Sequence, residues 1–391
     1  MEHVFDGIRV LDFGRHISAP YAALLMANMG ADVIKVEKSN LGDDTRVLGP
    51  WCNGITLYYP AFNYSKRSIA INFRHEESKK ILHDLVTNSD VLIENFRPGT
   101  IDQMGISYEA CKKINPGIIV LSISGFGQAG PYKDRAAFND VIESVGMMSF
   151  MLPSGIPITT CGGPIADVLT GVYGVSAVTA ALHHRKKTGT GQYIDMSMIN
   201  AATMMRSADV AAVACGVEME RKEAPAGVCR AKDNSYFNFW AGDNDTFERL
   251  RKVVCSPVMD DHKYDVLEER MKDEALLLAE VEKFAVTMSA AEAERLLNAA
   301  DIPCAAVSME IDAIELVQNE QLNAASWYAP IEVKGLDVFK FHAFPFKMSG
   351  CPNPVYKPAV KLGENNDEIF SELLGKTQVE IDTLRNANVI V

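Results

Sequence analysis

One carboxylate, Asp167, stands where its chemistry could be used. It follows two glycines and a proline and comes at the start of a long apolar stretch, which predicts a helix with Asp167 in its first turn. The helix dipole and the free N–H groups there stabilise a negative charge. We therefore expect an ionised side chain directed at the glycine-lined space before the helix. A simple helix-terminal charge explains the same local sequence equally well.

Cationic side chains form a second group of candidates. Lys38, Arg74 and Arg97 each fall just beyond the end of a predicted strand, and open α/β sheets bind ligands outside the carboxyl ends of their strands. Because most lysines and arginines are solvated surface residues, it is their position that marks these three. The other cationic candidates are Arg46, Lys66, Arg67, Lys133 and Arg135.

The common short catalytic motifs are missing from the sequence. It contains no G-x-S-x-G, no G-x-x-x-x-G-K-[ST] and no H-E-x-x-H. Residues 125–130 do match G-x-G-x-x-G and follow a predicted strand. They are followed by Pro131 and a charged run instead of an apolar helix, and the acidic residue that a dinucleotide site needs about twenty positions later is absent. A mobile glycine loop is the preferred interpretation.

Length and composition narrow the class of protein. The chain of 391 residues is 48% hydrophobic and 23% charged, as expected for a globular protein of two or three domains. A net charge of −13 without a basic run argues against nucleic acid and anionic membranes as partners. A small polyanion remains compatible, because a few local cations can hold one.

Targeting and metal signals are absent as well. The N-terminus has neither a basic start nor an apolar segment, so we expect no signal peptide. The apolar run at 168–182 is 15 residues long, too short to span a bilayer, and predicts a buried helix. Eight cysteines without a C-x-x-C pair fit neither a disulfide scaffold nor a zinc site. A cytoplasmic, metal-free protein is expected.

The hydrophobic pattern predicts the elements that must position these residues. In the first 125 residues strands alternate with helices, which is typical of a parallel sheet covered on both faces and of an α/β, Rossmann-like fold. The expected strands there are 8–13, 32–36, 68–73, 91–94 and 118–122, with helices at 18–29 and 76–87. The expected domains are a large domain over 1–218, a linker over 219–233, a small α/β domain over 234–325, and a return over 326–391 whose helices complete the large domain.

Several segments together resemble the family III CoA-transferases, which include formyl-CoA transferase and carnitine CoA-transferase. The matching segments occur in the family's order over most of the chain. They are 7–12, 18–20, 30–37, 42–46, 63–69, 94–99, 125–127, 166–167, 188–192, 302–304 and 362–364. Any one of them is weak, but this many in order is specific.

The resemblance implies an acyl-CoA enzyme with Asp167 as its nucleophile. In the family the matching aspartate attacks the thioester, forms a mixed anhydride and then an aspartyl–CoA thioester, with CoA as substrate and no tightly bound cofactor. A carboxylate suits this role because both its anhydride and its thioester are activated acyl carriers. The family also forms an interlocked homodimer. The CoA-binding positions that the resemblance implies, with Arg135 added as a nearby cation, are Lys38, Arg74, Asn95, Phe96, Arg97, Arg135 and Met198.

The residues expected around the acyl group depart from the family pattern. Ile17 stands where the family often has Gln, Phe138-Asn139 replaces a Y-D/E pair, and Glu143 replaces a Gln. No tetraglycine lid segment is visible. The residues expected in the acyl pocket or its loops are His16, Ile17, Gly125, Gly127, Phe138, Asn139 and Glu143.

Two alternatives remain beside a CoA-transferase. An α-methylacyl-CoA racemase shares the fold, but it pairs the aspartate with a histidine about thirty residues earlier, where residues 136–140 contain none. A non-catalytic CoA-binding homologue is the other alternative.

The sequence does not identify the substrate acids. Because the expected pocket segments 138–163 and 199–215 show no cluster of Arg or Lys, an apolar or mono-acid acyl group is favoured over a dicarboxylate. Methionines in these segments could line an adaptable pocket or belong to the core.

Overall fold

The chain divides into two compact units, each described here by itself. The computed structural model describes residues 2–148, 150–151, 157–158, 163–217, 222–307, 314–331, 333, 335–336, 340–354 and 356–391. The larger unit comprises Met1–Ser207 and Glu320–Val391, and the smaller comprises Ala208–Asn319.

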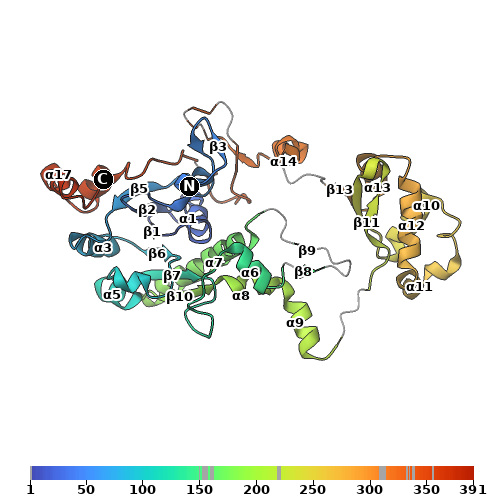
Figure 1. The fold of residues 1–391 in the computed structure, drawn as a ribbon, viewed down its shortest axis with the longest axis horizontal. Helices are drawn as coiled ribbons and strands as arrows, with labels where there is room; N and C mark the ends of the chain where they lie inside the picture. The colour runs from blue at the N-terminus through green and yellow to red at the C-terminus, as the bar shows by residue number, and fades with distance from the viewer. Residues whose placement is uncertain are drawn as a thin grey trace. The chain divides into compact units, whose positions relative to one another are not determined.

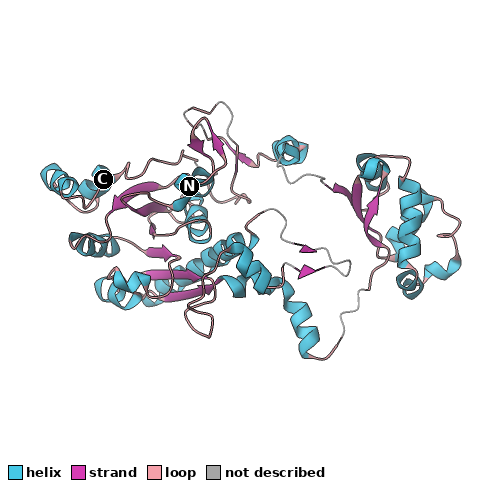
Figure 2. Ribbon diagram, in the orientation of Figure 1, coloured by secondary structure: helices cyan, strands magenta, loops and turns pink. Residues whose placement is uncertain are grey.

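The larger unit is built on a six-stranded sheet whose described pairings are all parallel (Figures 1 and 2). The strands lie in the order β10-β7-β6-β1-β2-β5, the order of a doubly wound α/β fold. The α/β prediction is thus confirmed. The strands are β1 (Arg9–Asp12), β2 (Asp32–Lys38), β5 (Arg67–Ile71), β6 (Val91–Glu94), β7 (Ile119–Ser124) and β10 (Tyr193–Ser197).

Apolar side chains explain why these strands lie inside the unit. Val, Ile and Leu dominate β6 and β7, whose residues are all buried, as expected for a sheet covered on both faces. One core packs around α1 and α7, and a second around α3, α5, α16 and α17. These helices are α1 (Ser18–Asn28), α3 (Glu77–Thr87), α5 (Tyr108–Ile114), α7 (Ile165–Thr188), α16 (Asn366–Glu372) and α17 (Gln378–Asn386).

The strand order places a topological switch point at the carboxyl ends of the neighbouring strands β1 and β6. The chain winds away from β1 toward β2 and β5, and from β6 toward β7 and β10, so the loops that follow β1 and β6 diverge at a topological switch point. Two hydrogen bonds tie these loops together. The Arg15 N–H donates to Asn95 Oδ1 and Asn95 Nδ2 donates to the Arg15 carbonyl, each at 2.8 Å. Both loops carry predicted site residues.

Two glycines allow α7 to pack closely against its neighbours. A Cβ at Gly171 would lie 2.9 Å from Tyr21 Cδ1 and 3.1 Å from the Ser18 carbonyl of α1, and one at Gly174 would lie 3.0 Å from Leu121 Cδ2 of strand β7. A larger residue at position 171 would push α7 away from α1, so Gly171 holds Asp167 near the start of α1. With 24 residues, α7 is longer than the apolar run that predicted it, and its length and composition would also suit a membrane span. Core helices share that pattern, and α7 packs in the first core.

The C-terminal segment returns to the larger unit. Asn366 Oδ1 accepts a hydrogen bond from Ala70 N–H, and Ile390 forms an antiparallel bridge with Ile71 at the edge strand β5. The remaining elements of this unit are short. They are β3 (Trp51–Cys52), β4 (Ile55–Thr56), α2 (Tyr58–Asn63), α4 (Thr100–Gln103), α6 (Asn139–Val145), β8 (Phe150–Met151), β9 (Pro157–Ile158), α8 (Met198–Thr203), α15 (Glu320–Ala324), β14 (Tyr328–Ala329) and β15 (Phe341–His342), with the 3₁₀ turns η1 (Asp44–Val47) and η2 (Met204–Arg206).

The smaller unit contains a three-stranded antiparallel sheet, β11-β12-β13. The segment predicted as a linker, 219–233, contains β11, whose Gly and Cys residues gave no strand signal. The stretch from His262 to Ala285 forms a 3₁₀ turn and two helices. The elements outside the larger unit, including α9, which begins at its last residue, are α9 (Ser207–Ala214), β11 (Ala226–Arg230), η3 (Lys232–Asn234), β12 (Tyr236–Trp240), α10 (Asn244–Val254), η4 (His262–Asp265), α11 (Leu267–Lys272), α12 (Glu274–Ala285), α13 (Ala290–Ala299), β13 (Cys304–Val307) and α14 (Ile314–Gln318).

Candidate active site

Asp167 lines two neighbouring cavities of the larger unit, each of about 390 Å³. Its carboxylate lies close to the hydroxyl and the backbone N–H of Ser18, the first residue of α1, and both of these groups favour its charged form. The side chain therefore meets the N-termini of two helices, its own α7 and the neighbouring α1. Although serine is a common N-cap residue, Ser18 is the first residue of α1 and makes no side-chain cap.

Burial decides the protonation of Asp167. Removal from water raises the pKa of this carboxyl to about 6; the hydroxyl and N–H of Ser18 oppose the shift, and the negative charges of Glu143 and Asp140 add to it. The predicted helix-dipole stabilisation is therefore outweighed by desolvation. At pH 7 the group is still mostly ionised, but it is a stronger base than an exposed aspartate.

Two side chains of α6 hold the start of α7. Asn139 Oδ1 accepts from the N–H groups of Ala166 and Asp167, at 3.1 and 3.3 Å. Glu143 is fully buried; its Oε1 accepts from Ala166 N–H at 3.3 Å, and its Oε2 has no hydrogen-bond partner among the described residues. These contacts occupy the free N–H groups of the helix and fix the backbone of Asp167.

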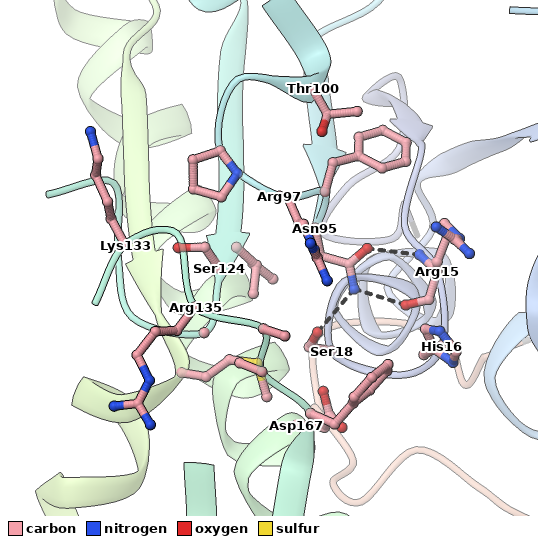
Figure 3. Close-up of a pocket in the computed structure, with 18 residues that line it drawn as sticks. Arg15, His16, Ser18, Asn95, Arg97, Thr100, Ser124, Lys133, Arg135 and Asp167 are labelled. Atoms are coloured by element: carbon pink, nitrogen blue, oxygen red, sulfur yellow. Dashed lines mark hydrogen bonds between the residues drawn. The ribbon is translucent and has the colours of Figure 1, made fainter. Parts of the chain in front are cut away.

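The first cavity is strongly cationic. Figure 3 shows Lys133 and Arg135 on one side of Asp167, and Arg15 and His16 on the other. The guanidinium of Arg135 lies over the ring of Tyr132, 4.4 Å from its centroid. The described part of the chain gives Lys133, Arg135 and Arg97 no ion-pair partner, so their charges are available. The cavity is lined by Arg15, His16, Ser18, Asn95, Phe96, Arg97, Pro98, Thr100, Ile123, Ser124, Gly125, Lys133, Arg135, Ala136, Ala137, Phe138, Asp167 and Met198.

Lys38 lies beside a smaller cavity of about 90 Å³, which shares Arg15 and Phe96 with the first. Its Nζ is 3.1 Å from Asp44 Oδ1, and Arg15 Nε donates to Asp44 Oδ2 at 2.8 Å. Burial raises the pKa of Asp44, but the two neighbouring cations outweigh burial and keep the pKa below its usual value. Lys38 is thus held at the edge of the cavity rather than free.

The second cavity differs in its chemistry. Phe138 and His16, in edge-to-face contact at 5.5 Å between ring centroids, border both cavities. Burial and then the charge of Asp167 raise the pKa of Tyr58, so its hydroxyl stays protonated beside that carboxylate. The residues that line this cavity are His16, Ile17, Leu48, Tyr58, Phe138, Asn139, Asp140, Gly163, Pro164 and Asp167.

Most of the predicted site residues meet at these cavities. Those that line one or more of them are Asp167, Lys38, Asn95, Phe96, Arg97, Arg135, Met198, His16, Ile17, Gly125, Phe138 and Asn139. Arg74 is exposed and does not line them, Glu143 lies behind Asn139, and the Gly127 N–H is taken up by Ser124 Oγ at 3.0 Å.

Sequence reasoning missed other residues of the site. Tyr58 and Leu48 come from the segment around β3, β4 and α2, whose two-residue strands are too short to show a period. None of the described residues in the expected pocket segment 199–215 lines either large cavity, and Met204 and Met205 are exposed. In the other expected pocket segment, 138–163, the side chains of Phe150 and Met151 lie outside the described residues.

The chain is similar to proteins of a known family over most of its length. The sequence model of CoA-transferase family III matches residues 5–366. The chain belongs to CoA-transferase family III. It is a transferase enzyme, as the resemblance implied.

Relatives of the chain carry CoA-transferase names. It is 31% identical to the succinyl-CoA–L-malate CoA-transferase beta subunit of Chloroflexus aurantiacus, over 98% of this chain and 97% of that one. It is also 31% identical to the acetyl-CoA:oxalate CoA-transferase of Acetobacter aceti, over 94% and 95%. The crystal structure of a CAIB/BAIF family protein from Brucella suis matches with a TM-score of 0.83 and 28% identity, over 95% of this chain and 100% of that one.

Proposed function

We propose that this family III enzyme moves CoA between an acyl-CoA and a free carboxylic acid, with Asp167 as covalent carrier. The observation that carries the proposal is the place of Asp167, at the junction of a cationic cavity and one whose described lining has no lysine or arginine. A CoA thioester needs that arrangement, because its phosphates are anionic while its acyl group lies at the opposite end.

Each proposed step exchanges one acyl bond for another. The Asp167 carboxylate attacks the thioester carbonyl, the C–S bond breaks, and CoA leaves as thiolate, which produces a mixed anhydride. The thiolate attacks the aspartyl carbonyl, so the donor acid departs and an aspartyl–CoA thioester forms. The acceptor carboxylate then displaces the thiolate to give a second anhydride. The returning thiolate attacks its acyl carbonyl and restores Asp167, so no water, ATP or metal takes part.

The raised pKa of Asp167 supports the nucleophilic role. Burial makes the carboxylate more basic, while a pKa of about 6 still leaves it ionised at neutral pH. A carboxylate with such a pKa is mostly ionised at neutral pH and is also more nucleophilic than an ordinary aspartate. The protonated hydroxyl of Tyr58 beside it supplies a donor for an oxygen that becomes negative during attack.

Cations around the first cavity support CoA as the substrate. Arg97, Lys133 and Arg135 have available charges there, and Lys38 and Arg15 adjoin the smaller cavity. In an enzyme of net charge −13, these side chains create a local positive field for a polyphosphate. Asn95, Phe96 and Met198 line the same cavity, where they would face the uncharged parts of CoA, while Arg74 would serve outside it.

Mass spectrometry of the intact protein tests the mechanism. After brief mixing with an acyl-CoA, we expect an adduct that hydroxylamine removes and that Asp167→Asn does not form. The same variant should lose at least about a thousandfold in kcat, the scale of losing a nucleophile. Asp140→Asn, which changes a neighbouring exposed carboxylate, serves as the matched control and should retain the adduct.

Two results would contradict covalent transfer. If no adduct forms but solvent deuterium enters the α-carbon of the acyl group, the protein is a racemase, with His16 the histidine that lies at the cavities beside Asp167. If CoA binds and neither signal is seen, the protein is a non-catalytic binding homologue.

We also propose a homodimer, as the family resemblance implies. The support is apolar surface on the larger unit: Val172 and Tyr173 of α7, and Met204 and Met205 after α8, are each at least 40% exposed. Large apolar side chains in such numbers are typical of surfaces that associate. Analytical ultracentrifugation should give twice the mass of 42.9 kDa, and a monomer at micromolar concentration would contradict the proposal.

A further inference from the structure

The second cavity has no cation among the described residues that line it. Its walls include the aliphatic side chains of Ile17 and Leu48, the rings of Tyr58 and Phe138, and Pro164. Among the described lining residues, Asp140 and Asp167 are the ones that carry carboxylates. His16 is no substitute for a lysine or arginine here, because its Nε2 lies 3.5 Å from Asp44 Oδ2 and thus already faces a carboxylate.

A second carboxylate on the acyl group would be poorly received in this cavity. It would leave water for apolar walls that offer no compensating cation, which is costly for any charge. It would also meet Asp140 and Asp167, two charges of its own sign. A methyl or methylene group in the same place would gain from burial against Ile17, Leu48 and the two rings.

Resting on the proposed function, we infer that this enzyme selects acyl groups that are uncharged and apolar, and discriminates against dicarboxylic acids. The volume of about 390 Å³ allows such a group ample room, because an apolar protein cavity of about 150 Å³ already holds benzene. The selection sets this chain apart from relatives whose names specify malate and oxalate.

Isotope exchange between an acyl-CoA and its own acid gives a direct test. Butyryl-CoA with ¹³C-butyrate is compared with succinyl-CoA and ¹³C-succinate, two acids of four carbons that differ by one methyl against one carboxylate. Since donor and acceptor are the same acid, no second substrate needs to be known. We expect kcat/KM for butyryl exchange to exceed that for succinyl exchange about a hundredfold, the scale of an uncompensated buried charge.

Substitution of Leu48 tests whether the missing cation is the cause. Leu48→Arg should narrow the butyryl-to-succinyl ratio by at least about tenfold, while Leu48→Gln, polar but uncharged, should change it much less. Equal effects of the two variants would show that charge is not what selects the acyl group and would overturn the inference.

The outcomes separate this inference from the proposed function. A ratio of tenfold or more in favour of butyryl-CoA supports the inference. A smaller ratio, or faster succinyl exchange, overturns it while CoA transfer itself stands. If no acyl-CoA undergoes exchange and none leaves an adduct on Asp167, both the proposed function and the inference fail.

Discussion

Buried charges are treated in opposite ways in two neighbouring regions of the larger unit. Beneath the loop that follows β1, Lys35 and Lys66 form a cluster with Asp12 and Asp43. Lys35 Nζ lies 3.0 Å from Asp43 Oδ2, and Lys66 Nζ lies 2.8 Å from Asp12 Oδ2. At the cavities above, Asp167 has no cation within ion-pair distance in the described structure, and its pKa is raised instead.

The paired charges of the cluster support the fold, and the unpaired charges at the cavities are available for chemistry. In the cluster, two lysines balance two aspartates, and the lysine ammonium groups also donate to main-chain carbonyls, Lys35 to Gly14 at 2.6 Å and Lys66 to Pro20 at 2.7 Å. These bonds fix both ends of the segment that carries His16 and Ser18. Charges that are paired thus hold the loop, whereas the unpaired carboxylate and the unpaired cations of the cavity remain available to a ligand. The following predictions test this division.

The largest effect is expected in the cluster. Lys66→Met removes one cation and leaves buried Asp12 with Lys35, at 3.5 Å, as its one remaining ion-pair partner in the described structure, so it should destabilise the larger unit by about 3–5 kcal/mol. The same substitution at exposed Lys133 should change stability by less than about 0.5 kcal/mol. Urea unfolding followed by circular dichroism measures both. Equal stability of Lys66→Met and wild type would show that the cluster does not support the fold.

A smaller effect of opposite sign is expected for Asp167→Asn. Folding raises the pKa of Asp167 from 3.8 to about 6, so the folded state holds the proton more tightly. Stability therefore falls as pH rises through this window and stays reduced above it. The neutral variant escapes this cost and should be about 1–3 kcal/mol more stable than wild type at pH 7. Toward pH 4, close to the unfolded pKa of 3.8, most of this difference should disappear.

Thermal unfolding between pH 4 and 7.5 tests that prediction. Exposed Asp134→Asn, which removes a carboxylate that does not contribute to the shift of Asp167, is the control and should follow the wild-type pH dependence. If Asp167→Asn unfolds with wild-type stability at every pH, the carboxylate is not held at a cost, and the contrast with the cluster disappears.

The sequence could reveal one of these regions more readily than the other. Alternating strands and helices predicted the parallel sheet, and since the carboxyl ends of parallel strands share one edge, Lys38 and Arg97 could be placed at the edge where the cavities lie. Tyr58 and Leu48 could not, because they come from turns without a period. Nor could the sequence tell Lys66, a buried cation, from Lys133, an exposed one, since the difference lies in partners that are distant in the chain. Asp12 is 54 residues from Lys66.

The smallest effect concerns a single unpaired cation at the first cavity, Arg97. It is exposed and makes no ion pair in the described structure, so Arg97→Ala should leave stability unchanged. If it contacts a phosphate of CoA, the KM for acyl-CoA should rise about tenfold with kcat and the KM of the acid unaffected, because the bond is the same in ground and transition states. The increase in KM with salt should also become shallower, since one fewer charge remains to be screened.

Arg385→Ala, which removes an arginine already paired with Asp367 and Asp382 on the surface, controls for a general loss of positive charge and should leave KM unchanged. If KM for acyl-CoA rises equally in the two variants, then net charge attracts the substrate, and not an available cation at the cavity. The distinction between paired and unpaired charges would then have no bearing on substrate binding.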